Sequence, residues 1–424
     1  FSLPFARKTS AATMCGHPHI RQDFMCEIDN KTADHAATQQ RRIPHKCMIL
    51  RRYPASLKTG PYLADYGTAP NGVLKRRHKR RAYGKTHKLV KGDTLMRPIT
   101  KHILAAGVAA AALMGVNAAS AQEVIKFAHV VAPNTPKGQG AEYFKKRAEE
   151  ILGDKVKIEI YPNSQLFDDD KVLPAILRGD VQFGAPSLAK FGKWTKKLQV
   201  FDLPFLFKDM DAVSCFQDGE KGQELLNAMS GKGLTGVGYW HNGLKQLSAN
   251  KPLRVPEDAA GQKFRIQSSD VIAAQFEAVD AVPQKMAFSE TYSALQTGVV
   301  DGQENTWSNI YSKKFFEVQD YITESNHGLL DYMVVTSTKW WEGLDPEIRD
   351  GLTQAMNEAS DYANGLSAEL TAEQRQAVID SGETEILQLS ADDFAKWQTA
   401  MKPVWDEFSG DIGQDIIDAA AACN

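Results

Sequence analysis

The sequence predicts an α/β protein with two lobes, each built around a sheet. Three patterns support this fold class. Strand and helix segments alternate over residues 124–185, which is typical of a parallel sheet with right-handed crossovers. A second group of strand segments begins near Gln246, and a long amphipathic helix follows Asp345-Pro346. Two sheets joined by crossing strands predict a cleft that closes by a hinge around a small ligand.

The first lobe is expected to form from alternating strands and helices. In order, we expect a strand at 124–129, a helix at 140–152, a strand at 156–161, a helix at 171–178 and a strand at 181–185. Ligands of such sheets bind beyond the carboxyl ends of the strands, where the strand order reverses. We therefore expect the loops 130–138 and 186–191 to border the cleft.

The second lobe is expected to contain its own sheet. Its strands are predicted near 246 and at 262–266, 281–285 and 300–305. Between the last two strands, Ser289 suits a helix N-cap and Gly298 suits the position just after the helix end. A further strand at 330–336 would return the chain to the first lobe.

The long helix begins with Asp345 as its cap and Pro346 as its first residue. Apolar residues then recur at spacings of three and four, which predicts one buried face. These residues are Ile348, Leu352, Ala355, Ala359, Tyr362, Leu366 and Leu370. A helix of this length is unusual in a globular domain. Amphipathic C-terminal helices are expected over residues 391–421.

Charge is distributed unevenly along the chain, although the formal net charge is only −2. Residues 1–95 hold 19 basic and 6 acidic residues, whereas the residues after 121 hold 29 basic and 46 acidic residues. The resulting net charge of −17 after residue 121 argues against nucleic acid as a partner. An anionic ligand would have to be held by local cations against this overall field.

Residues 96–121 have the pattern of a Sec-type signal peptide. A short basic stretch (96–101) precedes 14 mostly apolar residues (103–116), and Ala119-Ser120-Ala121 matches a cleavage site. The apolar run is shorter than the roughly 20 residues of a spanning helix, and a membrane anchor is the alternative. We expect cleavage after Ala121 and a periplasmic protein.

Residues 1–95 precede this signal and show neither helical nor strand periodicity. Their basic run at 75–85 could be a nucleic-acid-binding arm. We instead interpret residues 1–95 as a disordered extension that comes from translated non-coding sequence or a wrongly assigned start.

Of the five cysteines, Cys15, Cys26 and Cys47 fall in the extension. Export would allow a disulfide between Cys215 and Cys423. The sequence cannot give their separation, so two free or buried thiols are the alternative.

Several segments together resemble the DctP family, the solute-binding proteins of TRAP transporters, which capture dicarboxylates and other organic acids. They are YPNSQLFDDDK (161–171), GDVQFGAPSLAKF (179–191), the run 242–253, KFRIQSS (263–269), MAFSETYSALQTG (286–298) and VDGQEN (300–305). The resemblance spans roughly residues 122–420. It implies a two-lobed periplasmic-binding-protein architecture with crossing strands and a long helix that braces both lobes.

The resemblance implies that lobe I comprises 122–247 plus about 331–365, and that lobe II comprises 248–330 plus about 366–424. The partners it implies are a small organic acid and the TRAP membrane permease subunits. We expect a monomer without a cofactor.

Three residues are the main candidates for contacts with a ligand. An arginine in a strand, as at 265, is either a structural ion pair or a clamp that matches a carboxylate in two parallel bonds. The resemblance implies the clamp for Arg265 and a ligand contact for Asn305, whose alternative is a turn residue. The resemblance implies an arginine at this position in sialic-acid-binding relatives, whereas this sequence has Lys245. As a second cation it would suit a second carboxylate, and its alternative is a solvated lysine.

Five further residues are weaker candidates. Phe288 and Trp307 could wall the pocket, although core packing is the usual role of such residues. Ser187, Lys190 and Lys137 belong to the loops at the cleft edge, and each could equally be ordinary loop chemistry.

Other classes of site have little support. The carboxylates of Asp168-Asp169-Asp170 suit a helix start better than a metal site, because the helix dipole favours acidic residues there. The histidines after residue 121 lack metal-ligand spacing, and the same region has no nucleophile elbow, phosphate loop or paired-cysteine motif.

The sequence therefore predicts a non-enzymatic solute-binding protein for a C4-dicarboxylate such as succinate, malate or fumarate. The alternatives are an enzyme on the same fold, a sensor subunit for a receptor, or a binder of a monocarboxylate, sugar acid or aromatic acid.

Overall fold

The computed structural model describes residues 122–424. The expected extension, the signal peptide and the membrane-anchor alternative all lie outside these residues. None of the helices in residues 122–424 is both long enough and apolar enough to cross a membrane.

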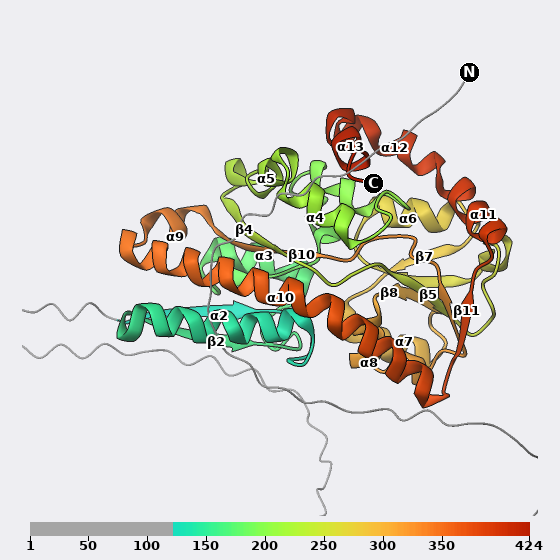
Figure 1. Ribbon diagram of the computed structural model, residues 1–424, viewed down its shortest axis with the longest axis horizontal. Helices are drawn as coiled ribbons and strands as arrows, with labels where there is room; N and C mark the ends of the chain where they lie inside the picture. Colours follow the sequence, from blue (N-terminus) through green and yellow to red (C-terminus); the bar gives the residue numbers. More distant parts are fainter. Residues whose placement is uncertain (1–121) are drawn as a thin grey trace, which may run out of the picture. The chain divides into compact units, whose positions relative to one another are not determined.

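The first sheet has five strands in the order β2-β1-β3-β10-β4 (Figure 1). Their bounds are β1 Glu123–Ala128, β2 Val156–Tyr161, β3 Phe183–Gly184, β4 Leu234–Trp240 and β10 Tyr332–Ser337. β1, β2 and β3 are parallel, as predicted, whereas β10 runs antiparallel to both of its neighbours. β4 was not predicted, and β3 is shorter than the predicted strand at 181–185.

The second sheet has six strands in the order β11-β9-β5-β8-β6-β7. Their bounds are β5 Gln246–Ala249, β6 Lys263–Ile266, β7 Val282–Lys285, β8 Gly302–Asn305, β9 Tyr321–Glu324 and β11 Glu385–Gln388. β5 is antiparallel to β8 and β9, and the other pairs are parallel. The predicted strands of this sheet correspond to β5, β6, β7 and β8, while β9 and β11 were not predicted.

Two segments carry the chain between the sheets. Residues 241–245 connect β4 to β5, and residues 325–331 connect β9 back to β10. The two segments meet at an antiparallel bridge between Leu244 and Leu329. Each sheet thus contains one reversed strand that belongs to a crossing connection, as the prediction of crossing strands requires.

Helices cover both faces of both sheets. Those that pack mainly on the first sheet are α2 Pro136–Leu152, α3 Asp169–Arg178, α4 Met210–Asp218, α5 Glu220–Leu226 and α9 Thr338–Gly343. Those of the second sheet are α6 Asp270–Glu277, α7 Thr291–Gln296, α8 Trp307–Ser312 and α11 Ala391–Met401. The α7 helix starts one residue later than predicted, with Glu290 and not Ser289 as its N-cap, because a 3-10 turn over Phe288–Glu290 precedes it.

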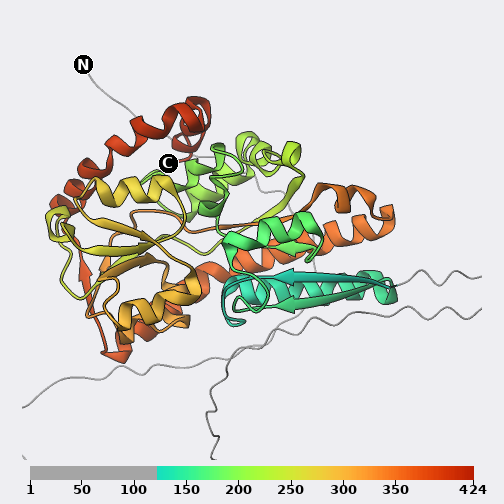
Figure 2. The same ribbon diagram turned by 180° about the vertical axis from the view of Figure 1, so that it is seen from behind.

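The long helix α10 spans Pro346–Ser381. The Asp345 carboxylate accepts a hydrogen bond from the Glu347 amide, which confirms the predicted cap. Figures 1 and 2 show α10 running from α2 on the first sheet to α8 beside the second. Leu352 and Ala359 pack into the first core and Val378 into a core of the second sheet, so the helix braces both lobes.

The last two helices, α12 Pro403–Ile412 and α13 Gln414–Ala421, differ from the expected lobe assignment. Their apolar residues, including Phe408 and Ile417, are buried in a core of the first lobe. A disulfide joins Cys215 in α4 to Cys423, with 5.8 Å between their Cα atoms. The segment 403–424 therefore packs mainly against first-lobe residues, and Cys215 and Cys423 are paired.

Candidate ligand-binding site

A small pocket lies between the two sheets, at the predicted carboxyl edge of the strands. Its cavity volume is about 20 Å³, which is room for about one water molecule, so the two lobes are closed tightly over it. Both lobes contribute to its lining, which comprises Val130, Val131, Asp168, Asp169, Asp170, Lys190, Arg265, Gln267, Ala287, Phe288, Asn305, Asn309, Leu330 and Tyr332. Four of the eight predicted ligand residues are in this set: Arg265, Asn305, Phe288 and Lys190.

Arg265 lies in β6 and is only 1% exposed. Its Nε and Nη2 donate to the carbonyl oxygen of Met286 at 3.2 and 2.9 Å. Among residues 122–424, no carboxylate lies within ion-pair distance of its guanidinium. Burial lowers the pKa of Arg265 to about 10, and the nearby charge of Glu304 opposes this shift, so the group is cationic at neutral pH. A buried cation without an acidic partner is costly, and an anionic ligand would compensate it.

Asn305 ends β8 and is also buried. Its Oδ1 accepts hydrogen bonds from Asn309 Nδ2 at 2.7 Å and from the Thr306 amide at 3.3 Å. Within the described part of the chain, no hydrogen bond uses its Nδ2. The amide is thus oriented by its acceptor and retains a donor for a ligand oxygen.

Phe288 forms an apolar wall of the pocket and also packs against the core. Its ring centroid lies 5.8 Å from the Arg265 Cζ, and it meets Phe315 edge-on with 6.1 Å between ring centroids. The two roles considered for this residue therefore coexist in the structure.

Lys190 comes from the first lobe, in the 3-10 turn Leu188–Phe191. Its side chain is 3% exposed. The ammonium donates to Asp170 Oδ2 at 2.8 Å and to Ser268 Oγ, in the second lobe, at 3.3 Å. Burial alone would raise the pKa of Asp170, but the charge and hydrogen bond of Lys190 hold it below its ordinary value.

Two further hydrogen bonds connect the lobes around the pocket. Ser289 Oγ donates to Asp168 Oδ1 at 3.3 Å, and Lys313 Nζ donates to Asn163 Oδ1 at 3.5 Å. Together with the contact between Lys190 and Ser268, they describe a cleft whose two sides are in contact.

Lys137 and Ser187 do not line the pocket. The Lys137 ammonium donates to the Ala185 carbonyl at 2.8 Å and lies 3.5 Å from the ring centroid of Tyr332, which does line it. Burial lowers the pKa of Lys137 to about 8. The Ser187 amide donates to Asp169 Oδ2 at 3.3 Å. Lys137 and Ser187 therefore contact residues that line the pocket, but they do not line it themselves.

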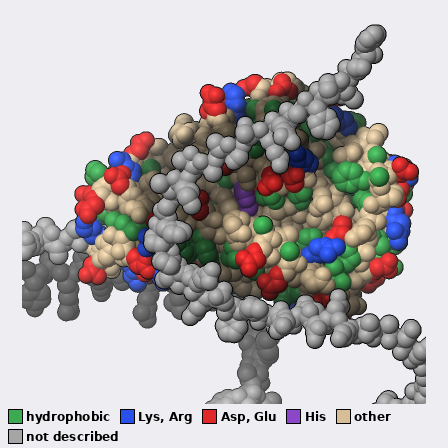
Figure 3. Space-filling model, in the orientation of Figure 1, with side chains coloured by type: hydrophobic (Ala, Val, Ile, Leu, Met, Phe, Trp, Pro, Cys, Tyr) green, Lys and Arg blue, Asp and Glu red, His purple; other side chains and the backbone are tan. Residues whose placement is uncertain are grey.

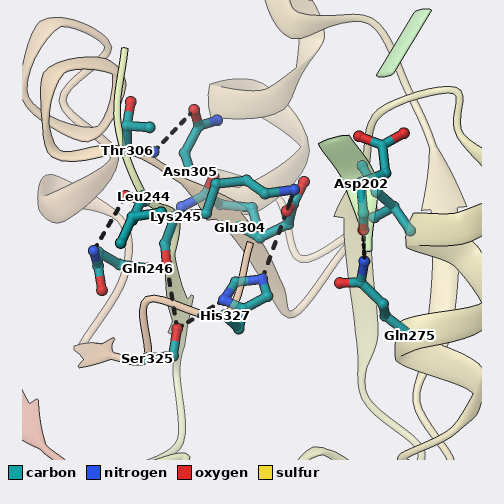
Figure 4. A network of polar contacts seen from close by, with 12 residues as sticks. Asp202, Leu244, Lys245, Gln246, Gln275, Glu304, Asn305, Thr306, Ser325 and His327 are labelled. Atoms are coloured by element: carbon teal, nitrogen blue, oxygen red, sulfur yellow. Dashed lines mark hydrogen bonds and ion pairs between the residues drawn. The ribbon is translucent and has the colours of Figure 1, made fainter. Parts of the chain in front are cut away.

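Lys245 is fully buried but lies outside the pocket lining. It forms an ion pair with Glu304, whose Oε2 is also 3.6 Å from His327 Nε2 (Figure 4). Lys245 was expected to face a ligand carboxylate or, as the alternative, solvent. The structure instead pairs it with a carboxylate of the protein, because Lys245 directly precedes β5, and β5 pairs with β8, which carries Glu304.

Trp307 begins α8 and is 4% exposed. It packs in a core of the second lobe, and its ring centroid lies 5.8 Å from the Arg375 Cζ. This arrangement agrees with the alternative of core packing and does not bring Trp307 to the pocket.

Sequence reasoning missed several residues of the pocket. Asp168 is the N-cap of α3, so the helix-start interpretation of the acidic run is confirmed, yet all three carboxylates also line the pocket. Gln267 has a buried Oε1 without a hydrogen-bond partner in residues 122–424. Its spacing of two from Arg265 puts it on the same side of an extended segment, and that signal could have identified it. Among residues 122–424, no group of His, Cys, Asp and Glu is arranged to hold a metal ion.

A family model and a similar known protein both point to the same family. The family model described as DctP, bacterial extracellular solute-binding protein, family 7, matches residues 127–411. The chain is 56% identical over 316 residues to a C4-dicarboxylate-binding periplasmic protein, DctP, of Shewanella loihica, which covers 74% of this chain and 94% of the relative.

Solved structures give the same fold. A TRAP periplasmic solute-binding protein from Shewanella oneidensis with bound succinate is 54% identical, has a TM-score of 0.71, and covers 72% of this chain and 100% of its own. Another from Pseudomonas aeruginosa PAO1 with bound L-malate is 46% identical, has a TM-score of 0.66, and covers 67% of this chain and 99% of its own.

Proposed function

Because this chain belongs to family 7 of the bacterial extracellular solute-binding proteins, the DctP family, we propose that it captures a C4-dicarboxylate such as succinate, malate or fumarate. The ligand would bind in the pocket between the lobes and be delivered to a TRAP-type secondary transporter. The family is one of solute-binding proteins and not of enzymes.

The observation that carries this proposal is the buried guanidinium of Arg265, which has no carboxylate partner among residues 122–424. A charge-assisted hydrogen bond contributes about 1.5–3 kcal/mol, whereas a micromolar ligand requires about 8 kcal/mol in total. Several groups must therefore act together. Asn305 offers a free amide donor beside Arg265, and Phe288 supplies apolar contact for the carbon chain of the acid.

The choice of a dicarboxylate follows from the two cations of the pocket. Arg265 comes from the second lobe and Lys190 from the first, so each lobe can bind one carboxylate of the same ligand. We assign to Lys190 the second-carboxylate contact that the sequence suggested for Lys245. The succinate and L-malate bound by the two similar structures support this ligand class.

Capture would proceed by closure of the lobes. A ligand shifts the open and closed populations only by its difference in affinity for the two states. A dicarboxylate held by both lobes has this property, because its second contact exists only when the lobes meet. The closed form would then present one continuous surface to the membrane permease.

We further propose that the protein works in the periplasm as a monomer, after cleavage behind Ala121. The periplasmic location of the similar DctP protein supports this compartment. On the face seen in Figure 3, acidic and basic side chains of the described residues are interspersed. A protein that is strongly acidic after residue 121 must bind its anionic ligand through the two local cations.

Calorimetric titration with succinate, malate and fumarate tests the proposal. We expect low-micromolar or tighter binding to at least one acid, and a loss of at least about tenfold in affinity in Arg265→Ala. Arg178→Ala is the matched control, since Arg178 is exposed and, in the described part of the chain, pairs only with Asp180. Absence of binding by folded protein would contradict the dicarboxylate, and unchanged affinity in Arg265→Ala would contradict the clamp.

A further inference from the structure

The ammonium of Lys190 is held in place by two side chains from different parts of the fold. Asp170 near the start of α3 accepts one hydrogen bond at 2.8 Å, and Ser268 just after β6 accepts another at 3.3 Å. An ammonium has three N–H donors. Hydrogen bonds within residues 122–424 use two of them, which leaves one donor for the pocket that Lys190 lines.

The position of Asp170 is unexpected for an anion site. Its carboxylate lines the same pocket as Arg265 and would repel a negatively charged ligand. Since lysine has a flexible four-carbon stem, the ammonium needs a partner to fix its direction. The side chain of Asp170 is itself 42% exposed, whereas that of Lys190 is 3% exposed, so the pair joins a solvated acid to a buried cation.

We infer that Asp170 is a positioning residue for ligand selection, which directs the remaining N–H of Lys190 at the second carboxylate of the ligand. Ser268 makes this geometry depend on closure, because it belongs to the opposite lobe. The inference rests on the proposed function. If Asp170 has this role, it contributes to the preference for dicarboxylates over monocarboxylates of the same shape.

Two simpler roles for Asp170 predict different behaviour. A residue that only favours the start of α3 through the helix dipole would affect stability and not ligand preference. A residue that acted only as a nearby negative charge would weaken the binding of any anion, so its removal would strengthen succinate binding. The positioning role predicts the opposite, namely that removing this negative charge weakens the binding of a dianion.

The test compares succinate with succinamate, in which an amide replaces one carboxylate. In Asp170→Ala, we expect the dissociation constant for succinate to rise by about tenfold and that for succinamate to change much less. Asp170→Asn keeps an oxygen acceptor at the same place and should retain part of the preference for succinate. Ser268→Ala should reduce the preference in the same direction.

Asp180→Ala is the matched control for this experiment. Asp180 follows the other end of α3, pairs with Arg178 at 2.7 Å and is 45% exposed, so it resembles Asp170 in exposure and pairing but lies outside the pocket lining. Thermal unfolding of each variant verifies that the fold is intact. We expect Asp180→Ala to keep the wild-type ratio of the two dissociation constants.

An unchanged ratio in Asp170→Ala, or tighter binding of succinate, would overturn the positioning role. These outcomes are distinct from a failure of the proposed function, in which the unmodified protein itself would bind neither succinate nor another C4-dicarboxylate. A wild-type protein that binds both ligands equally would also overturn the inference, because Lys190 would then not distinguish a carboxylate from an amide.

Discussion

Two basic residues, Arg265 in β6 and Lys245 in the connection before β5, have almost the same exposure but different surroundings. Both are buried to within 1% of their surface. Lys245 is paired with Glu304, whereas no carboxylate of the described residues pairs with Arg265. Burial raises the pKa of Glu304, but Lys245 and His327 together lower it below its ordinary value, and the charge of Glu304 also acts on Arg265. The ion pair of Lys245 and Glu304 is therefore structural, whereas the guanidinium of Arg265 is the group that we propose binds the ligand.

This pairing predicts the effect of removing Lys245. Lys245→Met would leave the buried Glu304 without its ammonium, and the free energy of unfolding should fall by about 3–5 kcal/mol. Chemical denaturation at neutral pH measures this loss. In Lys245→Arg, which keeps the positive charge, the loss should be much smaller. A Lys245→Met protein of normal stability that no longer binds succinate would instead support the ligand contact suggested by the sequence.

At the scale of elements, the packing of α2 against α10 depends on small residues. A Cβ atom added at Gly140 in α2 would lie 2.8 Å from the Cβ of Ala363 in α10. Both atoms are attached directly to helical backbones, so neither can rotate away, and the helices would have to separate. The short distance between α2 and α10 at this point therefore requires glycine at 140.

We therefore expect Gly140→Ala to destabilise the protein by about 1–2 kcal/mol, despite the better helix propensity of alanine. Gly365→Ala is the control on α10 itself, because a Cβ there has no atom within 4 Å. It should be neutral or stabilising by up to about 1 kcal/mol. Thermal or chemical unfolding of the two variants gives the comparison, and equal effects would show that the helices have room to adjust.

Across residues 122–424, the C-terminal segment makes a further connection between the lobes. In α11, Trp397 and Met401 are buried in a core of the second lobe, whereas Phe408 and Ile417 of the following helices are buried in the first. The disulfide between Cys215 and Cys423 fastens the end of this segment to α4. The chain thus crosses between the lobes through 241–245, 325–331, α10 and the junction after α11.

The disulfide should contribute substantially to stability, because it joins residues that are 208 positions apart. Replacing both cysteines with alanine should lower the free energy of unfolding by about 2–5 kcal/mol. A thiol reductant should destabilise the wild type by a similar amount and leave the double variant unaffected. The affinity for succinate should be retained, since neither cysteine lines the pocket. Equal stability of the two proteins would contradict this prediction.

Local patterns in the sequence were enough to predict several of the helices and strands. The alternation of residues 263–266 indicated β6, and the Asp345-Pro346 cap with its apolar spacing indicated α10, because these features depend on neighbours within a few residues. The short strands β9 and β11 gave no such signal, since their pairing with distant segments defines them. Of the residues that line the pocket, Arg265, Asn305 and Phe288 were predicted from residue type and family resemblance, and Lys190 from its loop at a strand end.

The contacts between charged groups depend on how distant segments pack. The partner of Lys245 is 59 positions away in Glu304, and Lys190 meets Asp170 and Ser268 from two other elements. The same holds for the pairing of Cys215 with Cys423 and for the return of α12 and α13 to the first lobe. Periodicity records which face of an element is buried, but the partner of a buried charge is set by how separate elements pack, which no local pattern contains.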